Sequence, residues 1–211
     1  LQIGSAVNLI SFSVNNGISL EILSGGTASG TVVNSGGIYL LQSDASGINI
    51  AINSGGYLEA GAGSIISGVT VSNGGKLELL GDATVNNYFI SSGGLLAIAE
   101  GADLLNYSTS YGVTLLVSSG GVATGLTLKN SGLVNLLYSG VATSLTISSG
   151  GIAQVSSGGS LNRTVLYNSG ILNVLSGGIN TSATINSGGI IEISSAGIDT
   201  KTIINSSGFL K

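Results

Sequence analysis

Five amino-acid types are missing from this sequence, and charged residues are scarce. The 211 residues include no proline, cysteine, histidine, methionine or tryptophan, and only 7% are charged. Without cysteine, no disulfide can hold the fold together. The five Lys and Arg residues are spread from Lys76 to Lys211 and cannot form a basic patch, so we expect no nucleic-acid binding.

Long apolar runs are missing as well. No window approaches the roughly 18 apolar residues of a membrane-spanning helix. The opening Leu1-Gln2-Ile3 carries no basic segment, so we expect no signal peptide within this sequence. Disorder requires low hydrophobicity and high net charge, whereas here 43% of residues are hydrophobic and the net charge is −4. The chain is therefore apolar enough to pack a core.

Glycine is abundant and recurs at a nearly constant interval. Each Asn/Ser-rich turn contains a final glycine, and successive ones lie 18 to 20 residues apart: Gly17, Gly37, Gly56, Gly75, Gly94, Gly112, Gly132, Gly151, Gly170, Gly189 and Gly208. A second turn, such as Ser24-Gly25-Gly26, lies near the middle of most units. Glycine supplies the positive φ angles of tight corners, and Ser and Asn bond to their own backbone there. The chain is therefore a repeat with corners.

Between the corners, apolar and polar residues alternate. Examples are Leu77-Glu78-Leu79 and Leu126-Thr127-Leu128. This period of two is typical of half-buried strands, and frequent glycine would make a helix costly. The absence of proline suits strands that all donate to a hydrogen-bond ladder.

Short strands in units of about 19 residues, without helices, predict one all-β domain. We expect a single right-handed parallel β-helix of roughly 10–11 coils, with residues 17–211 as repeats and residues 1–16 as an irregular segment or first coil. One predicted inward stack, broken only by Ser108, is Val33, Ile52, Val71, Ile90, Ser108, Leu128, Ile147, Leu166, Ile185 and Ile204.

Outward residues should form ladders from coil to coil. Asn135, Gln154, Asn173 and Glu192 are predicted to share one face. Glu59 and Glu78 are predicted to stack as like charges, which costs a little energy that nearby Lys76 can relieve. We interpret these ladders as solvated surface.

Chemistry-bearing residues do not gather anywhere in the pattern. The aspartates are scattered and Arg163 is the only arginine, so Glu59 and Glu78 have no cationic or aromatic groove beside them. Nearly all the Gly-Gly turns lack the aspartate of calcium-binding repeats. We therefore expect no enzyme activity, no catalytic residue, no cofactor and no metal site. A carbohydrate-active β-helix is the weakest alternative.

Several repeats resemble those of a known family. Residues 24–37 (SGGTASGTVVNSGG), 120–132 (GGVATGLTLKNSG) and 177–189 (GGINTSATINSGG) are similar to the repeats of AIDA-type self-associating autotransporter adhesins, and the likeness runs from about Gly17 onward. The resemblance implies an exported passenger domain at the bacterial outer-membrane surface. It also implies cell adhesion, self-association, biofilm formation and, in some members, heptose on repeat serines.

From the resemblance we expect as partners copies of the chain itself, lateral or end-to-end, together with host or matrix glycans and proteins, and a heptosyltransferase. Exposed corner serines that repeat at coil spacing are the expected O-glycosylation sites, for example Ser35, Ser54, Ser119 and Ser187.

The last expectation concerns the two ends, where no polar cap is visible in the sequence. Two explanations stay open: the chain is part of a longer passenger, or its ends pair with other copies and build an extracellular filament.

Overall fold

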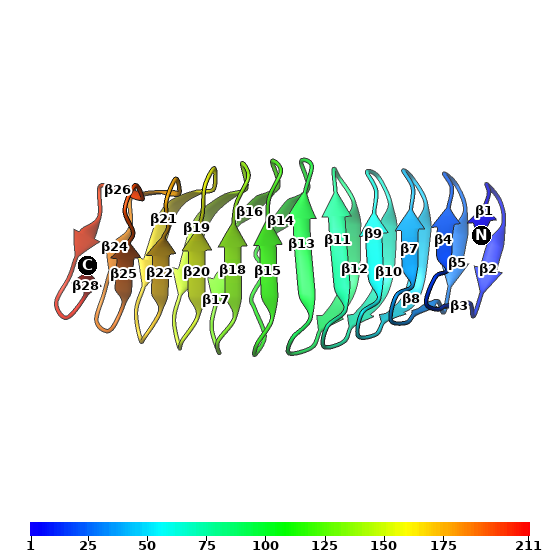
Figure 1. Cartoon of the computed structure of the whole chain (residues 1–211), viewed down its shortest axis with the longest axis horizontal. Coiled ribbons are helices and arrows are strands. Elements are labelled where there is room, and N and C mark those ends of the chain that lie inside the picture. Colours follow the sequence, from blue (N-terminus) through cyan, green and yellow to red (C-terminus); the bar gives the residue numbers. More distant parts are fainter. The chain divides into compact units, whose positions relative to one another are not determined.

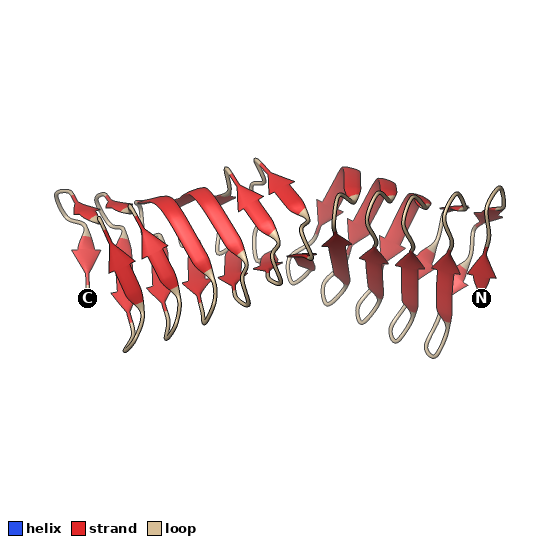
Figure 2. Ribbon diagram, turned by 90° about the horizontal axis from the view of Figure 1, so that it is seen from above, coloured by secondary structure: helices blue, strands red, loops and turns tan.

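The chain consists of short strands joined by turns, and Figure 2 shows no helix. The computed structural model describes all residues, Leu1–Lys211. It is an all-β parallel solenoid of about 11 turns with about 19 residues per turn, which confirms the predicted fold class. The chain divides into two compact units, unit 1 (Leu1–Ala97) and unit 2 (Ile98–Lys211). The structure has no helix with the length and apolar character needed to cross a bilayer.

The first sheet, sheet A, takes one strand from each coil (Figure 1). Its strands that begin in unit 1 are β1 (Gln2–Ile3), β4 (Ser19–Ile22), β7 (Ile38–Leu41), β9 (Tyr57–Ala60), β11 (Lys76–Leu80) and β13 (Leu95–Ala99). Its strands in unit 2 are β15 (Thr114–Val117), β18 (Leu133–Leu136), β20 (Ile152–Val155), β22 (Ile171–Val174), β25 (Ile190–Ile193) and β28 (Phe209–Leu210).

The other strands form sheet B in unit 1 and sheet C in unit 2. Sheet B contains β2 (Asn8–Ile10), β3 (Ser13–Val14), β5 (Thr27–Ser29), β6 (Val32–Val33), β8 (Ser46–Ile52), β10 (Ile65–Val71) and β12 (Thr84–Ile90). Sheet C contains β14 (Asp103–Leu105), β16 (Val122–Thr124), β17 (Thr127–Leu128), β19 (Val141–Ile147), β21 (Ser160–Leu166), β23 (Ile179–Thr181), β24 (Thr184–Ile185), β26 (Ile198–Thr200) and β27 (Ile203–Ile204).

The register between neighbouring coils is more regular than the spacing of the glycines. Paired residues are 19 positions apart in both units, as in Lys76 with Tyr57 and Leu133 with Thr114. The apparent intervals of 18 and 20 around Gly112 arise because the residue one coil before Gly132 is Val113, and the first interval of 20 arises because the residue one coil before Gly37 is Ile18.

Two residues of the predicted inward stack are exposed. Ile204, in the last coil, is in register with Ile185 but is 49% exposed, and Ser108 was assigned to the wrong face by the same irregular corner. Ser108 is exposed and pairs with the outward residue Thr127. Its neighbour Thr109 is 1% exposed and takes the inward position, beside Leu128. Counting from Gly112 shifted this coil by one residue, and a shift of one residue moves a side chain to the opposite face of a strand.

Each coil also contains a bend that the sequence pattern did not reveal. Every nineteenth residue has a positive φ between 52° and 85°: Ser11, Gly30, Asn49, Gly68, Asn87, Asn106, Gly125, Ser144, Arg163, Ser182 and Lys201. The left-handed residue interrupts the strand pairing, so Gly68 lies outside the matched register of β8 and β10. Glycine and asparagine adopt positive φ readily, so they are expected at such a bend. Arginine and lysine are not, so Arg163 and Lys201 make the 19-residue repeat of the bend hard to recognise in the sequence.

Every second residue along a strand points inward, and these inward residues form the core. Leu20, Tyr39, Leu58 and Leu77 follow one another in register in unit 1, and all are at most 1% exposed. Gly56 shows why the corner needs glycine, since a Cβ there would lie 2.5 Å from the carbonyl oxygen of Val33.

Candidate functional site

The predicted ladder lies on sheet A of unit 2. Asn135, Gln154, Asn173 and Glu192 are in register on β18, β20, β22 and β25. All four side chains are half-buried, and the Oδ1 atoms of Asn135 and Asn173 are covered without a hydrogen-bond partner. At the end of this ladder Glu192 forms a 2.8 Å ion pair with Lys211. The face is polar and nearly uncharged.

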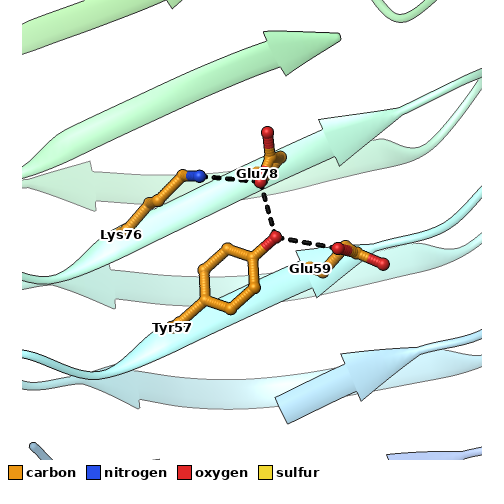
Figure 3. A network of polar contacts seen from close by, with 4 residues as sticks. All are labelled: Tyr57, Glu59, Lys76 and Glu78. Atoms are coloured by element: carbon orange, nitrogen blue, oxygen red, sulfur yellow. Dashed lines mark hydrogen bonds and ion pairs between the residues drawn. The ribbon is translucent and has the colours of Figure 1, made fainter. Parts of the chain in front are cut away.

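The equivalent face of unit 1 carries acidic side chains (Figure 3). Glu59 and Glu78 are paired on β9 and β11, as the sequence indicated. The hydroxyl of Tyr57 lies 2.8 Å from Glu59 Oε2 and 2.5 Å from Glu78 Oε2. Lys76 Nζ lies 2.8 Å from Glu78 Oε2 and 4.8 Å from the centre of the Tyr57 ring. Sequence reasoning missed Tyr57, whose outward position beside the glutamates was the available signal.

These contacts hold the two carboxylates in one hydrogen-bonded network. Burial raises the pKa of Glu78, but the hydrogen bonds from Lys76 and Tyr57 outweigh it, and the net pKa is lowered. Burial and the bonds to Glu78 and Glu59 raise the pKa of Tyr57. A carboxylate that is hard to protonate beside a phenol that is hard to ionise is poorly suited to proton transfer near neutral pH.

Asparagines form a second kind of ladder along the corners. In unit 1, Asn53 Nδ2 donates to Asn34 Oδ1 and Asn34 Nδ2 donates to Asn15 Oδ1, each at 2.8 Å. In unit 2, Asn205 donates in the same way to Asn186 at 2.8 Å. Each amide uses one donor and one acceptor, so the ladder extends from coil to coil without a net charge.

The four candidate serines all lie exposed on turns. Ser35 and Ser54 occupy the same corner of successive coils in unit 1, and Ser187 occupies the equivalent corner in unit 2. Ser119 belongs to the other corner of its coil and has a φ of +50°. Neighbouring coils are about 4.8 Å apart, so corner hydroxyls repeat at that spacing.

The outer face of sheet B contains a groove that the sequence did not indicate. It has a volume of about 490 Å³ and crosses β8, β10 and β12 at three consecutive bend residues, Asn49, Gly68 and Asn87. Tyr88 and Phe89 also line it and are 36% and 61% exposed. Nowhere in the chain are three or more His, Cys, Asp or Glu side chains grouped to hold a metal ion.

Comparison with known proteins gives a match among the solved structures. No family model matches the sequence, and no curated protein matches it. Among solved structures, the chain is similar to the crystal structure of a TibC-catalysed, hyper-glycosylated TibA fragment, with 28% identity and a TM-score of 0.63. The match covers 100% of this chain and 90% of the TibA chain. TibA is an AIDA-type self-associating autotransporter, so the predicted resemblance to AIDA-type passenger repeats is confirmed over the full length of the chain.

Proposed function

We propose that this chain is a passenger-type solenoid displayed on a bacterial cell surface, where it promotes adhesion and self-association without catalysis. The full-length match to the TibA passenger fragment carries this proposal. The neutral amide ladders and the low charge content of 7% support it, because two such surfaces can approach with little repulsion.

Repetition gives the proposed association its strength. A single exposed polar contact contributes little, but a contact that repeats about every 4.8 Å along a ladder can be made many times between the same two molecules. The asparagine ladder at Asn15, Asn34 and Asn53 and the corner serines provide such repeating donors and acceptors.

Cells that display the chain on an outer-membrane anchor provide the test. Displaying cells should settle faster than cells that carry the empty anchor, and the difference should grow with cell density. Equal settling, with no binding to host or matrix material, would reject the proposal. If the purified chain instead assembles into long filaments under the electron microscope, end-to-end stacking becomes the better account.

The corner serines are the proposed attachment points for glycans. Ser35, Ser54, Ser119 and Ser187 are exposed, as a glycosyltransferase requires, whereas Ser64 is fully buried and serves as an internal control. After co-expression with a heptosyltransferase such as TibC, peptide mass spectrometry should find added heptose on corner serines and none on Ser64. An intact mass equal to that of the bare chain would reject this assignment.

A further inference from the structure

The groove on sheet B is a consequence of the bend repeated in each coil. Asn49, Gly68 and Asn87 lie one above another at the bend, each with a positive φ. Because Gly68 has no side chain, a gap opens between the two exposed asparagines. Asn49 Oδ1 lies 2.9 Å from the position that a Cβ of Gly68 would take, so the amide of Asn49 leans across this gap.

An aromatic wall and a hydroxyl complete the groove. Phe89 lies on the outward side of β12, in register with Thr70, and is 61% exposed, so its ring is accessible to a ligand. Exposed Thr70 pairs with Phe89 in register and adds a hydroxyl group beside its ring. Aromatic surface next to a few converging polar groups is the usual composition of a small-molecule site, and about 490 Å³ is within the usual size range.

The polar groups of the groove select for an uncharged ligand. No Lys, Arg, Asp or Glu lines it, so neither an anion nor a cation would find a counter-charge there. The two carboxamides and the hydroxyl of Thr70 can both donate and accept hydrogen bonds. A sugar ring presents hydroxyl groups at its edge and C–H groups on its face, and these match amides and an aromatic ring respectively.

We propose that this groove binds a neutral sugar ring, which stacks on Phe89 and forms hydrogen bonds with Asn49 and Asn87. The inference deepens the adhesion proposed above and rests on it, because it assigns the displayed surface a ligand class. Binding by one ring would be weak, in the millimolar range, and would become effective at a cell surface through many copies.

Ligand-observed NMR on the full chain tests the proposal. The probes are the methyl glycosides of glucose, galactose and N-acetylglucosamine, with glucuronic acid as the charged comparison. At least one neutral glycoside should receive saturation from the protein through its ring protons, and glucuronic acid should not. The variant Phe89→Ala should weaken binding about tenfold, since it removes one aromatic contact.

A matched pair of variants separates groove filling from damage to the fold. Gly68→Asn should abolish binding, because it places in the gap the residue type that Asn49 and Asn87 already carry at the same bend. Gly125→Asn makes the same change at the equivalent bend of unit 2 and should leave binding unchanged. Circular dichroism should be the same for both variants.

Three results would overturn the inference: no saturation transfer to any neutral glycoside, equal binding to glucuronic acid, or unchanged binding by both Phe89→Ala and Gly68→Asn. Failure of the groove is distinguishable from failure of the proposed function. Clumping of cells that display Phe89→Ala would support self-association even if no sugar binds.

Discussion

The two units bury polar side chains in opposite ways. In unit 1, the hydroxyl groups of Thr31, Tyr39 and Ser64 are buried; Thr31 and Tyr39 interact only with each other, and Ser64 has no hydrogen-bond partner. In unit 2, the fully buried Thr164 and Asn180 are paired, although the Oδ1 atoms of the half-buried Asn135 and Asn173 are not. Thr164 Oγ1 lies 3.3 Å from Asn180 Oδ1, and Asn180 Nδ2 donates to Asp199 Oδ1 at 2.5 Å. The unit 2 groups form a chain that leads to part-buried Asp199, whereas the unit 1 hydroxyls have no such connection out of the core.

This difference shows that the solenoid backbone does not depend on the identity of a single inward residue. A buried hydroxyl without a partner costs about 1–3 kcal/mol, and a paired one contributes about 1 kcal/mol. Both situations occur inside the same 19-residue register. The inward apolar stacks, the backbone ladders and the corner glycines are common to both units and therefore stabilise both, and polar side chains should modify stability locally.

The largest effect is expected at the corners, where the two units are alike. A Cβ at Gly56 would lie 2.5 Å from Val33 O, and one at Gly159 would lie 2.4 Å from Leu136 O. Gly56→Ala in unit 1 and Gly159→Ala in unit 2 should each lower the free energy of unfolding by about 3 kcal/mol. Gly4→Ala, with nothing within 4 Å, is the control. Denaturant titration measures all three, and a tolerated corner alanine would contradict the shared-backbone account.

The next largest effect should come from the buried amide of unit 2. Asn180→Ala removes the acceptor of Thr164 and the donor to Asp199, and it leaves a cavity. We expect a loss of about 2–3 kcal/mol. Exposed Asn162, on the neighbouring strand, should tolerate the same change within about 0.5 kcal/mol. Similar losses for the two variants would mean that the buried chain of hydrogen bonds is not stabilising.

Tyr57→Phe tests the acidic ladder of unit 1. The substitution removes a hydroxyl that bonds to the carboxylates of both Glu59 and Glu78. Without it, the repulsion between the two negative charges is less well compensated. Hydrogen bonds to charged groups contribute about 1.5–3 kcal/mol, so a loss of about 2 kcal/mol is expected. Tyr138→Phe, at a 69% exposed position in unit 2, should have no measurable effect.

The same ladder should make the two units respond differently to acid. The pKa of Glu78 is lowered in the fold from its ordinary value of 4.5, so its contribution is fully present above that pH and is lost as the pH falls through the folded pKa. The amides of unit 2 do not titrate. Hydrogen exchange followed at decreasing pH should therefore show an acid-dependent loss of protection near β9 and β11, and Glu78→Gln should remove this dependence. If the acid-dependent loss of protection persists in Glu78→Gln, another titrating group causes it.

The smallest effect sharpens the comparison, because removal of a buried hydroxyl should have opposite signs in the two units. Ser64→Ala removes a buried hydroxyl without a partner and should raise the free energy of unfolding by about 1 kcal/mol. Thr164→Val removes a paired hydroxyl and should lower it by about 1 kcal/mol. Thermal unfolding of the two variants measures both effects. Shifts of the same sign in the two variants would contradict the difference between the two cores.

Much of this architecture could be predicted from the sequence because strand alternation and corner glycines are local signals. Leu77-Glu78-Leu79 specifies one buried face, and the spacing of glycines specifies the coil length. The positions of Asn135, Gln154, Asn173 and Glu192 in one register followed from that length alone.

The remaining features depend on neighbours that only the folded coils bring together. The bend at Arg163 or Lys201 has no sequence signal, because either residue can adopt positive φ when hydrogen bonds on both sides fix the backbone. The groove at Gly68 depends on three bends lying above one another. Ser108 was assigned the inward position that Thr109 takes, because the corner of this coil ends in Val113 instead of glycine.

Self-association at the cell surface is the central functional claim, and a mixed-cell experiment tests it most directly. Green cells that display the chain are mixed with red cells that carry only the empty anchor, and the clumps are imaged. Self-association predicts clumps made almost entirely of green cells. Clumps that contain red and green cells in equal numbers, or no clumps at all, would contradict it.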